Sequence, residues 1–305
     1  MIYAKKCKCF RTLDCNLRIK NSRMKPKEAS CYLKSEYIVG KRMFNFSADR
    51  LPVTIILLFS LADFIVFFLV DSIWVFIVYW LLMIIPKGAI SAWNHHHQHR
   101  NTFKKAWMNR ILEFFYAVHT GATTNLWVLH HNFGHHQNYL DQDKDQSRWK
   151  RKDGSAKSIL GYSFEVALTA FPRAFEVGKN YPKQQKAFIL YSGITFLILA
   201  GLAFYKPIAT IFIFILPMIV SLIYTSWATY GHHVGLDTSD EFSASHNNMS
   251  KWYNILTGNL GYHTAHHYKQ GVHWSKLPAL HATIKDKIPP ECYNKSFYQK
   301  LVSKK

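Results

Sequence analysis

Two long apolar blocks, residues 51–90 and 187–230, constrain most strongly how this chain folds. Three charged residues interrupt the first block: Asp63, Asp71 and Lys87. Lys206 is the only charged residue of the second. Since a helix needs about 20 apolar residues to cross a bilayer, each block predicts two spans joined by a short turn. We therefore predict an all-α membrane protein with four transmembrane helices in two hairpins, about 51–92 and 187–230.

Three histidine clusters lie outside the centres of these blocks. They comprise His95 and His99; His131, His135 and His136; and His263, His266 and His267. On a helix, residues three or four positions apart share one face, so each cluster aims its imidazoles in one direction. Imidazole binds iron, copper, nickel and zinc, and eight imidazoles exceed what one tetrahedral zinc site takes. The spacing predicts a centre of two metal ions, with no catalytic side chain beyond that centre.

A further ligand is expected where the fourth span ends. The second span leads almost directly into His95, and the fourth leads into His232 and His233. Neighbouring helix residues point about 100° apart, so only one residue of this pair is expected to face the metals. The centre is therefore predicted at the membrane face, within reach of a chain lying in the bilayer. Candidate acceptors for the ring N–H groups of the ligands are Asp141, Asp143, Asp145, Asn247, Asn248 and Asn259.

The distribution of charge predicts the orientation in the membrane. The formal net charge is +20, without a nucleic-acid-binding motif, and the basic residues concentrate in four segments: 1–50, 100–110, 148–186 and 269–305. We attribute this charge to membrane topology and to attraction to anionic lipid. Lys206 is the only basic residue at either predicted far-side turn. Because segments rich in Lys and Arg stay in the cytoplasm, both termini and all three histidine clusters are predicted on the cytoplasmic side.

The chain is expected to have three parts. They are a basic cytosolic leader (1–50), a four-span domain (51–285) and a basic C-terminal tail (286–305). Within the domain, a cytosolic loop (95–186) connects the hairpins, and a cytosolic region (231–285) carries the third cluster. Residues 107–118 and 160–175 of the loop predict helices that lie in the membrane interface or pack in a cytosolic cap. The five cysteines form no CxxC pair, which favours free thiols in a reducing compartment.

The histidine motifs and their surroundings resemble the membrane fatty acid desaturase family. That family carries three histidine boxes, HxxxH, HxxxHH or HxxHH, and HxxHH, on a four-span scaffold, which the three clusters match in order. Residues 259–267, with the sequence NLGYHTAHH, and residues 271–278, GVHWSKLP, followed by His281, are very similar to the region of the third box. The resemblance covers roughly residues 50–285. It implies a membrane-bound helical fold with the histidines around a non-haem di-iron centre.

The resemblance also implies an activity and its partners. Members of the family use O2 to remove hydrogen from an unactivated C–H bond, so a long acyl chain, as a lipid or thioester, is the expected substrate. The eight box histidines resemble iron ligands. His233, in an H-x-G setting, resembles a further ligand, with His232 as the alternative, whereas His96 and His97 match no family role. No cytochrome b5-type segment and no paired CxxC occur, so electrons are expected from a separate ferredoxin-, rubredoxin- or cytochrome b5-like protein, favoured by the basic face.

Other functions remain open from the sequence. The HxxxHH spacing of the second box also occurs in alkane hydroxylases of the same superfamily, which add oxygen where a desaturase removes a second hydrogen. A His-rich metal transporter or a structural membrane protein would be further alternatives. A transporter should carry its metal ligands inside the spans. These spans contain no histidine, and Asp63 is their one mid-span acid. We expect Asp63 to bond Ser60 or Thr195, or to contact a substrate tunnel.

Overall fold

The computed structural model describes residues 43–294, so most of the predicted leader and part of the predicted tail lie outside the described residues. The chain divides into two units, Met1–Met43 and Phe44–Lys305, and every element named below belongs to the second. Within the described range the regular structure is helical, with isolated β-bridges and no strand. The predicted all-α fold is confirmed.

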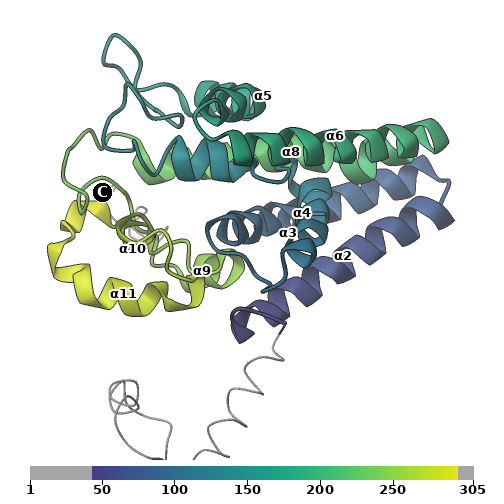
Figure 1. Cartoon of the computed structure of the whole chain (residues 1–305), viewed down its shortest axis with the longest axis horizontal. Coiled ribbons are helices and arrows are strands. Elements are labelled where there is room, and N and C mark those ends of the chain that lie inside the picture. The colour runs from purple at the N-terminus through teal and green to yellow at the C-terminus, as the bar shows by residue number, and fades with distance from the viewer. Residues whose placement is uncertain (1–42, 295–305) are drawn as a thin grey trace, which may run out of the picture. The chain divides into compact units, whose positions relative to one another are not determined.

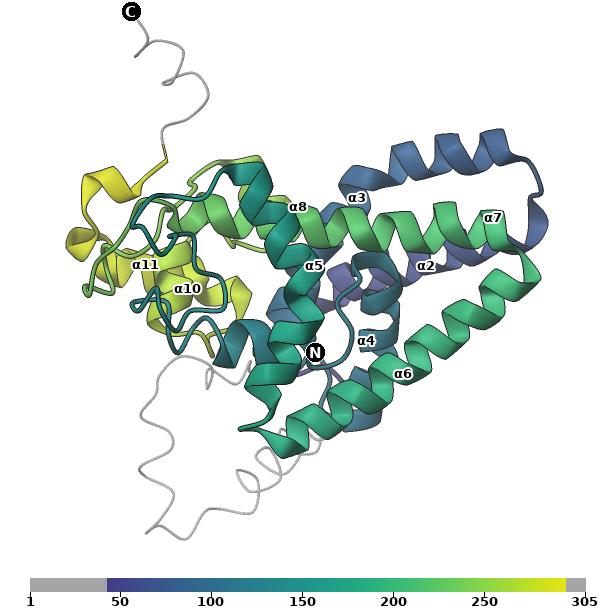
Figure 2. The same cartoon turned by 90° about the horizontal axis from the view of Figure 1, so that it is seen from above.

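Four helical segments are long and apolar enough to cross a membrane (Figures 1 and 2). They are α2 (Arg50–Leu69) with the short η2 (Ser47–Asp49) before it, α3 (Ile73–His99), α6 (Pro182–Tyr205), and α7 (Pro207–Thr210) with η4 (Ile211–Ile215) and α8 (Leu216–His233). Only 22–39% of the apolar window of each span is buried inside the protein, and many of its other apolar side chains are exposed, as is typical of helices that face lipid. The four predicted spans are confirmed, whereas their sidedness stays a prediction.

Short connections join α2 to α3 and α6 to α7, and Figure 2 shows both at the same end of the helices. Lys206 lies in the second connection and reaches the first. Its Nζ donates to the carboxylate of Asp71 (2.6 Å) and to the carbonyl oxygen of Val70 (3.2 Å). Its ammonium therefore satisfies carbonyl and carboxylate oxygens at the end of α2, where a helix leaves its last carbonyls without intrahelical donors.

Pro217 has a specific consequence for the fourth span. Proline has no N–H, so it cannot donate to the carbonyl oxygen four residues earlier, which belongs to Ile213. The chain forms the wider π-helical turn of η4 (Ile211–Ile215) at this place, and Lys87 Nζ donates to Ile213 O at 2.8 Å. A lysine of α3 thus replaces the backbone donor that the proline lacks.

The same lysine neutralises the acid inside the first span. Asp63 is fully buried and accepts from Lys87 Nζ (2.9 Å) and from the hydroxyl of Tyr79 (2.7 Å). His119 Nδ1 lies 3.3 Å from the same carboxylate, and its Nε2 lies 2.9 Å from Ser60 Oγ. Asp63 is therefore paired with Lys87, and the expected bond to Ser60 or Thr195 is replaced by this ion pair between α2 and α3.

Shorter helices pack against one end of the spans. In chain order they are α4 (Ala106–Thr120), the π-helical η3 (Val128–Phe133), α5 (Ile159–Gly178), α9 (Lys251–Thr257), α10 (His263–Tyr268) and α11 (Leu277–Ile284). The helices predicted at residues 107–118 and 160–175 correspond to α4 and α5, which both contact α8. Figure 1 shows α10 and α11 beside the ends of α3 and α8. This end of the bundle holds the histidine clusters.

Candidate metal centre

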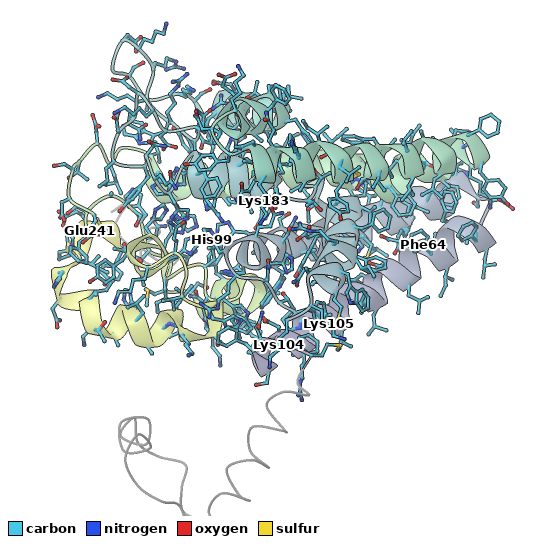
Figure 3. The ribbon with its side chains drawn as sticks, viewed as in Figure 1. Phe64, His99, Lys104, Lys105, Lys183 and Glu241 are labelled. Atoms are coloured by element: carbon cyan, nitrogen blue, oxygen red, sulfur yellow. The ribbon has the colours of Figure 1, made fainter. Side chains whose placement is uncertain are left out.

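The first cluster is carried by the second span itself. Helix α3 continues without a break to His99 and ends at Arg100, whose backbone is extended. His95 and His99 are therefore one turn apart on the same helix, and their ring centroids lie 4.7 Å apart. Figure 3 shows His99 among other side chains inside this end of the bundle, far from Phe64 on α2. The predicted continuation of the span into the cluster is confirmed.

The second cluster lies on a π-helical turn, where regular helical spacing had predicted an α-helix. The segment η3 ends at Phe133, and the N–H of His136 bonds the carbonyl of His131 five residues before it (2.8 Å). Such i→i+5 bonding stacks residues five apart, which brings the Nε2 atoms of His131 and His136 to 2.9 Å. Gly134 permits this turn, because a Cβ at that position would lie 2.4 Å from the carbonyl oxygen of His130.

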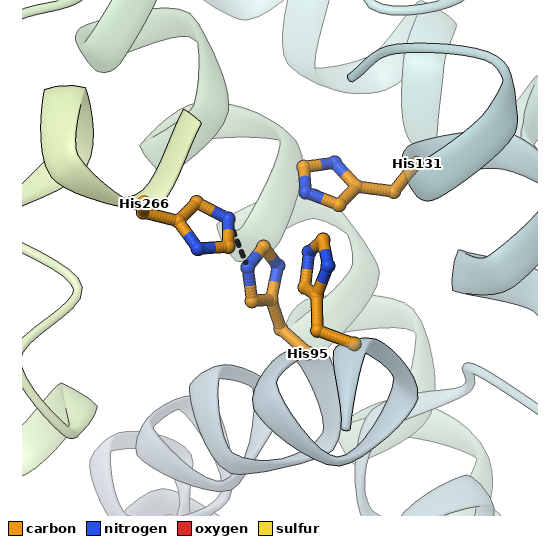
Figure 4. A group of neighbouring side chains, drawn as sticks. His95, His131 and His266 are labelled. Atoms are coloured by element: carbon orange, nitrogen blue, oxygen red, sulfur yellow. Dashed lines mark hydrogen bonds between the residues drawn. The ribbon is translucent and has the colours of Figure 1, made fainter. Parts of the chain in front are cut away.

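The nine predicted ligands form two adjacent groups. In the first histidine group, ring nitrogens of His95, His99, His131 and His266 all lie within 4.8 Å of one another, and in the second those of His135, His233 and His267 do so. His136 joins the first group, since its Nε2 lies 3.0 Å from that of His266. His263 joins the second, with its Nε2 3.1 Å from that of His233. Figure 4 shows His95, His131 and His266 converging from three separate segments.

His232 and His233 point in different directions at the end of α8. The Nε2 of His233 lies 3.2 Å from that of His135 and 3.1 Å from that of His263. The Nε2 of His232 instead lies 3.0 Å from the hydroxyl of Tyr253, and its ring stacks on His263 at 3.9 Å. His233 is therefore a member of the second histidine group, and His232 lies beside it.

Burial favours the neutral form of several of these rings. Among the grouped histidines outside the candidate membrane spans, five have a pKa well below the ordinary histidine value: His131, His136, His263, His266 and His267. Burial is the main cause, and the neighbouring imidazoles lower the pKa further. A neutral imidazole offers a lone pair to a metal. The Nε2 of His99 is buried without a hydrogen-bond partner in the described part of the chain, as expected of an atom that ligates. The donor set fits two transition-metal ions.

A family model described as fatty acid desaturase matches residues 72–298 of the chain. The chain belongs to the fatty acid desaturase family. The matched region contains all nine histidines of the two groups, and the resemblance of the three boxes is confirmed. No curated protein and no solved structure matches the chain.

Membership identifies the protein as an integral membrane oxidoreductase of the fatty acid desaturase and hydroxylase type. The family implies a lipid substrate, a non-haem di-iron centre and the use of O2, and the two histidine groups fit a metal site of this kind. Within the groups every donor is an imidazole. This distinguishes the desaturase-type centre from soluble di-iron bundles, which use carboxylates.

Of the six candidate acceptors for the ligand rings, one contacts a histidine of the groups. Asp145 is buried, and its Oδ1 lies 2.8 Å from Nδ1 of His135. Asn247 instead holds the start of α10, because its Oδ1 accepts from the N–H of Thr264 at 3.1 Å. The others bond elsewhere or face solvent: Asp141, Asp143, Asn248 and Asn259. Backbone acceptors such as the carbonyl of Ala244, 3.0 Å from Nδ1 of His233, have no sequence signal.

The remaining histidines of the boxes have other partners. His96 Nε2 lies 2.9 Å from the carbonyl oxygen of Thr257. His97 lies between Thr102 Oγ1 (2.9 Å) and Glu113 Oε1 (3.3 Å). These contacts tie α3 to neighbouring segments, and the ring of His96 lies beside the first histidine group, 6.3 Å from that of His266. Glu113 was not singled out from the sequence, since an acid in an interfacial helix usually faces solvent.

We expect Asp145→Ala to weaken metal binding by about 10–100-fold, the usual effect of removing the partner of a ligand histidine. The carboxylate fixes which nitrogen of His135 carries the proton, and its loss frees the ring to turn. Titration of the metal-depleted protein with Fe(II) measures the affinity. Asp143→Ala is the matched control, because Asp143 is exposed in the same loop and should leave the affinity unchanged. Equal affinities in both variants would contradict the assignment.

Proposed function

We propose that this protein is an O2-dependent desaturase of long acyl chains. The observation that carries the proposal is the pair of histidine groups, buried at the end of a bundle of membrane spans. Iron suits imidazole ligands, and the site lies where a chain in the bilayer can reach it. His95, His99, His131, His136 and His266 would hold one iron. His135, His233, His263 and His267 would hold the other.

A narrow slot between α3, α8 and α9 reaches the histidine groups. It has a volume of about 40 Å³. Gly88 and Tyr224 line one end, and His95, His131 and His263 line the other. Gly88 keeps the slot open at that end, since a Cβ there would already contact the ring of Tyr224 at 3.4 Å. The slot is far smaller than a site for a whole ligand, which takes about 300–1,000 Å³, so it would admit at most a few carbon atoms of a hydrocarbon chain.

The reaction requires electrons from outside this chain. Conversion of –CH2–CH2– to –CH=CH– supplies two electrons and two protons, whereas reduction of O2 to two molecules of water consumes four of each. A separate one-electron carrier must therefore deliver two electrons, and two further protons come from the medium. We propose a ferredoxin-, rubredoxin- or cytochrome b5-like carrier that docks on the basic cytoplasmic side, with both termini and the histidine groups on that side.

Each part of the chain has a defined task in this proposal. When bound, the two irons supply the activation of O2. The imidazoles bind them as neutral ligands, and Asp145 orients His135 through its 2.8 Å contact. Eight of the nine rings are at most 7% exposed, and His99 is half-buried with its Nε2 buried. This burial excludes water from the reacting region. The slot would admit only the part of the acyl chain that lies next to the histidine groups.

The test is a lipid profile of a host that expresses the protein together with a competent electron donor. We expect acyl chains that have lost two hydrogens, seen as a mass decrease in the extracted lipids, and no such product from a His266→Ala variant. Acyl chains that gain one oxygen would instead show that the protein is a hydroxylase. An unchanged profile, with the protein inserted and iron bound, would refute both activities.

The two histidines that end α8 provide a second expected result. His233→Ala should lower the iron content by about one ion per protein and abolish turnover, because His233 lies among the rings of the second histidine group. His232→Ala should have a milder effect, since His232 contacts Tyr253. Metal analysis and product formation of both purified variants measure this. Unchanged iron and turnover in His233→Ala would remove it from the ligand set.

A further inference from the structure

A second cavity lies on the other side of α3 from the slot. It is a groove of about 570 Å³ between the beginning of α2, residues 85–93 of α3 and helix α9. Figure 1 shows where these three elements lie. Its walls are apolar almost throughout, with Ile55 and Phe59 on α2 and with Ile90 and Trp93 on α3. The volume lies in the range of sites for drug-sized ligands. None of the nine grouped histidines lines it.

The few polar groups in the wall are already satisfied. The Asn254 side chain donates to the carbonyl of Asn248 and accepts from the N–H of Gly261. Asn259 donates to the carbonyl of Trp274. A ligand in the groove therefore finds hydrocarbon contacts and no free hydrogen-bonding group, and a polar solute would lose its hydration without compensation. These walls suit an acyl chain.

The position of the groove indicates where that chain comes from. Residues 48–59 and 85–93, which supply most of the wall, belong to two candidate membrane spans. Helix α9 lines the groove together with Asn259 and Trp274. It also has exposed apolar side chains, with Trp252 71% exposed, Ile255 52% and Leu256 50%. A helix with such exposed side chains lies in the membrane interface. The groove thus opens where the bilayer meets the protein.

The rim of the groove carries a positive charge at Lys251, which begins α9, whose residues 254–256 line the groove. Arg50 lies on the opposite face of α2 from the wall residues Pro52, Ile55 and Phe59, since successive helix residues point about 100° apart. The Lys251 side chain is exposed and forms no ion pair with another residue of the described range. Cations at the membrane surface attract anionic headgroups. The apolar floor and the cation at the rim together match a lipid with an anionic headgroup.

We propose that this groove binds one acyl chain of an anionic phospholipid of the surrounding bilayer, at a site separate from the one where substrate reacts. The bound lipid packs between α2, α3 and α9. It also lies next to the histidine region, because Trp93 of the wall packs edge-on against His96, and His96 bonds Thr257 at the end of α9. Lipid binding therefore stabilises the arrangement of α9 against α3.

The test uses phosphatidylglycerol with brominated acyl chains, which quench tryptophan fluorescence on contact. Trp93 and Trp274 both line the groove, so titration of the detergent-purified, iron-loaded protein should show saturable quenching. Ala89→Phe and Ala48→Phe fill the groove from two different elements, and both should lose the saturable component. Ala200→Phe is the matched control, because Ala200 is exposed on α6 outside the groove, and it should keep that component.

Two further measurements define the chemistry of the bound lipid. Lys251→Gln should reduce the preference for phosphatidylglycerol over phosphatidylcholine by about fivefold, whereas Arg50→Gln, on the other face of α2, should leave the preference unchanged. The lipid should also raise the melting temperature of the wild type and of Ala200→Phe, and not that of the groove-filling variants. Saturable quenching that persists in a groove-filling variant of native helical content would overturn the proposal. Displacement of the brominated lipid by stearoyl-coenzyme A would also overturn it, since the groove would then belong to the substrate path.

Discussion

His131→Gln should reduce product formation by more than about 100-fold and lower the iron content, whereas His130→Gln should change neither. Removing even an outer partner of a metal ligand commonly costs 10–100-fold, and His131 lies inside the first histidine group, with its Nε2 2.9 Å from that of His136. A glutamine side chain preserves much of the volume, but its amide is a weak ligand for iron. Metal analysis and product formation on purified protein measure both effects.

His130 is a closely matched control for this substitution. The two residues are neighbours in η3, and both are buried, His130 at 2% and His131 at 6% exposure. The ring of His130 packs edge-on to Trp127, away from the two groups, and neither of its nitrogens bonds a described residue. Circular dichroism should show the same helical content in both variants. Full iron content in His131→Gln, or equal losses in both, would contradict the proposed first iron site.

Lys87→Met should destabilise the folded protein by about 3–5 kcal/mol, the usual cost of leaving one member of a buried ion pair without its partner. The side chains of Lys87 and Asp63 are at most 1% exposed. Lys87 also donates a hydrogen bond to the carbonyl oxygen of Ile213, which Pro217 cannot do because it has no N–H. The substitution therefore leaves a carboxylate and a carbonyl unsatisfied. Unfolding with sodium dodecyl sulfate in mixed micelles, followed by circular dichroism, measures the free energy.

The double variant Asp63→Leu/Lys87→Met should recover most of this loss, because it removes the unpaired carboxylate and leaves only the Ile213 carbonyl without a donor. Lys206→Met is the control for loss of a lysine in an ion pair. Its partner Asp71 is 87% exposed, and exposed pairs contribute at most about 1 kcal/mol. A Lys87→Met protein as stable as Lys206→Met would show that the buried pair does not stabilise the bundle.

Local features of the chain were sufficient for the architecture. The length of an apolar run determines whether a helix can cross a bilayer, and this property is read residue by residue, so four spans could be predicted from residues 51–90 and 187–230. The histidine clusters could also be predicted, since their members lie within a few residues of one another. The continuation of the second span to His99 followed from the same local pattern.

Contacts between distant segments could not be predicted in this way. The division of the rings into two groups places His136 with His266 and His135 with His233, pairs separated by 130 and 98 residues. The pairing of Asp63 with Lys87 could not be predicted because the two residues lie 24 positions apart on different spans. The π-helical turn at His131 was missed because its spacing is also compatible with an α-helix.

The sequence by itself determined that this protein is a four-span helical membrane protein with three clusters of imidazoles, because hydrophobic length and helical spacing are local. Only the tertiary structure decided which imidazoles meet, that His233 rather than His232 faces them, and that Asp145 and the carbonyl of Ala244 hold two of the rings. These contacts depend on how α3, α8 and α10 pack, and packing is set by side chains far apart in the chain.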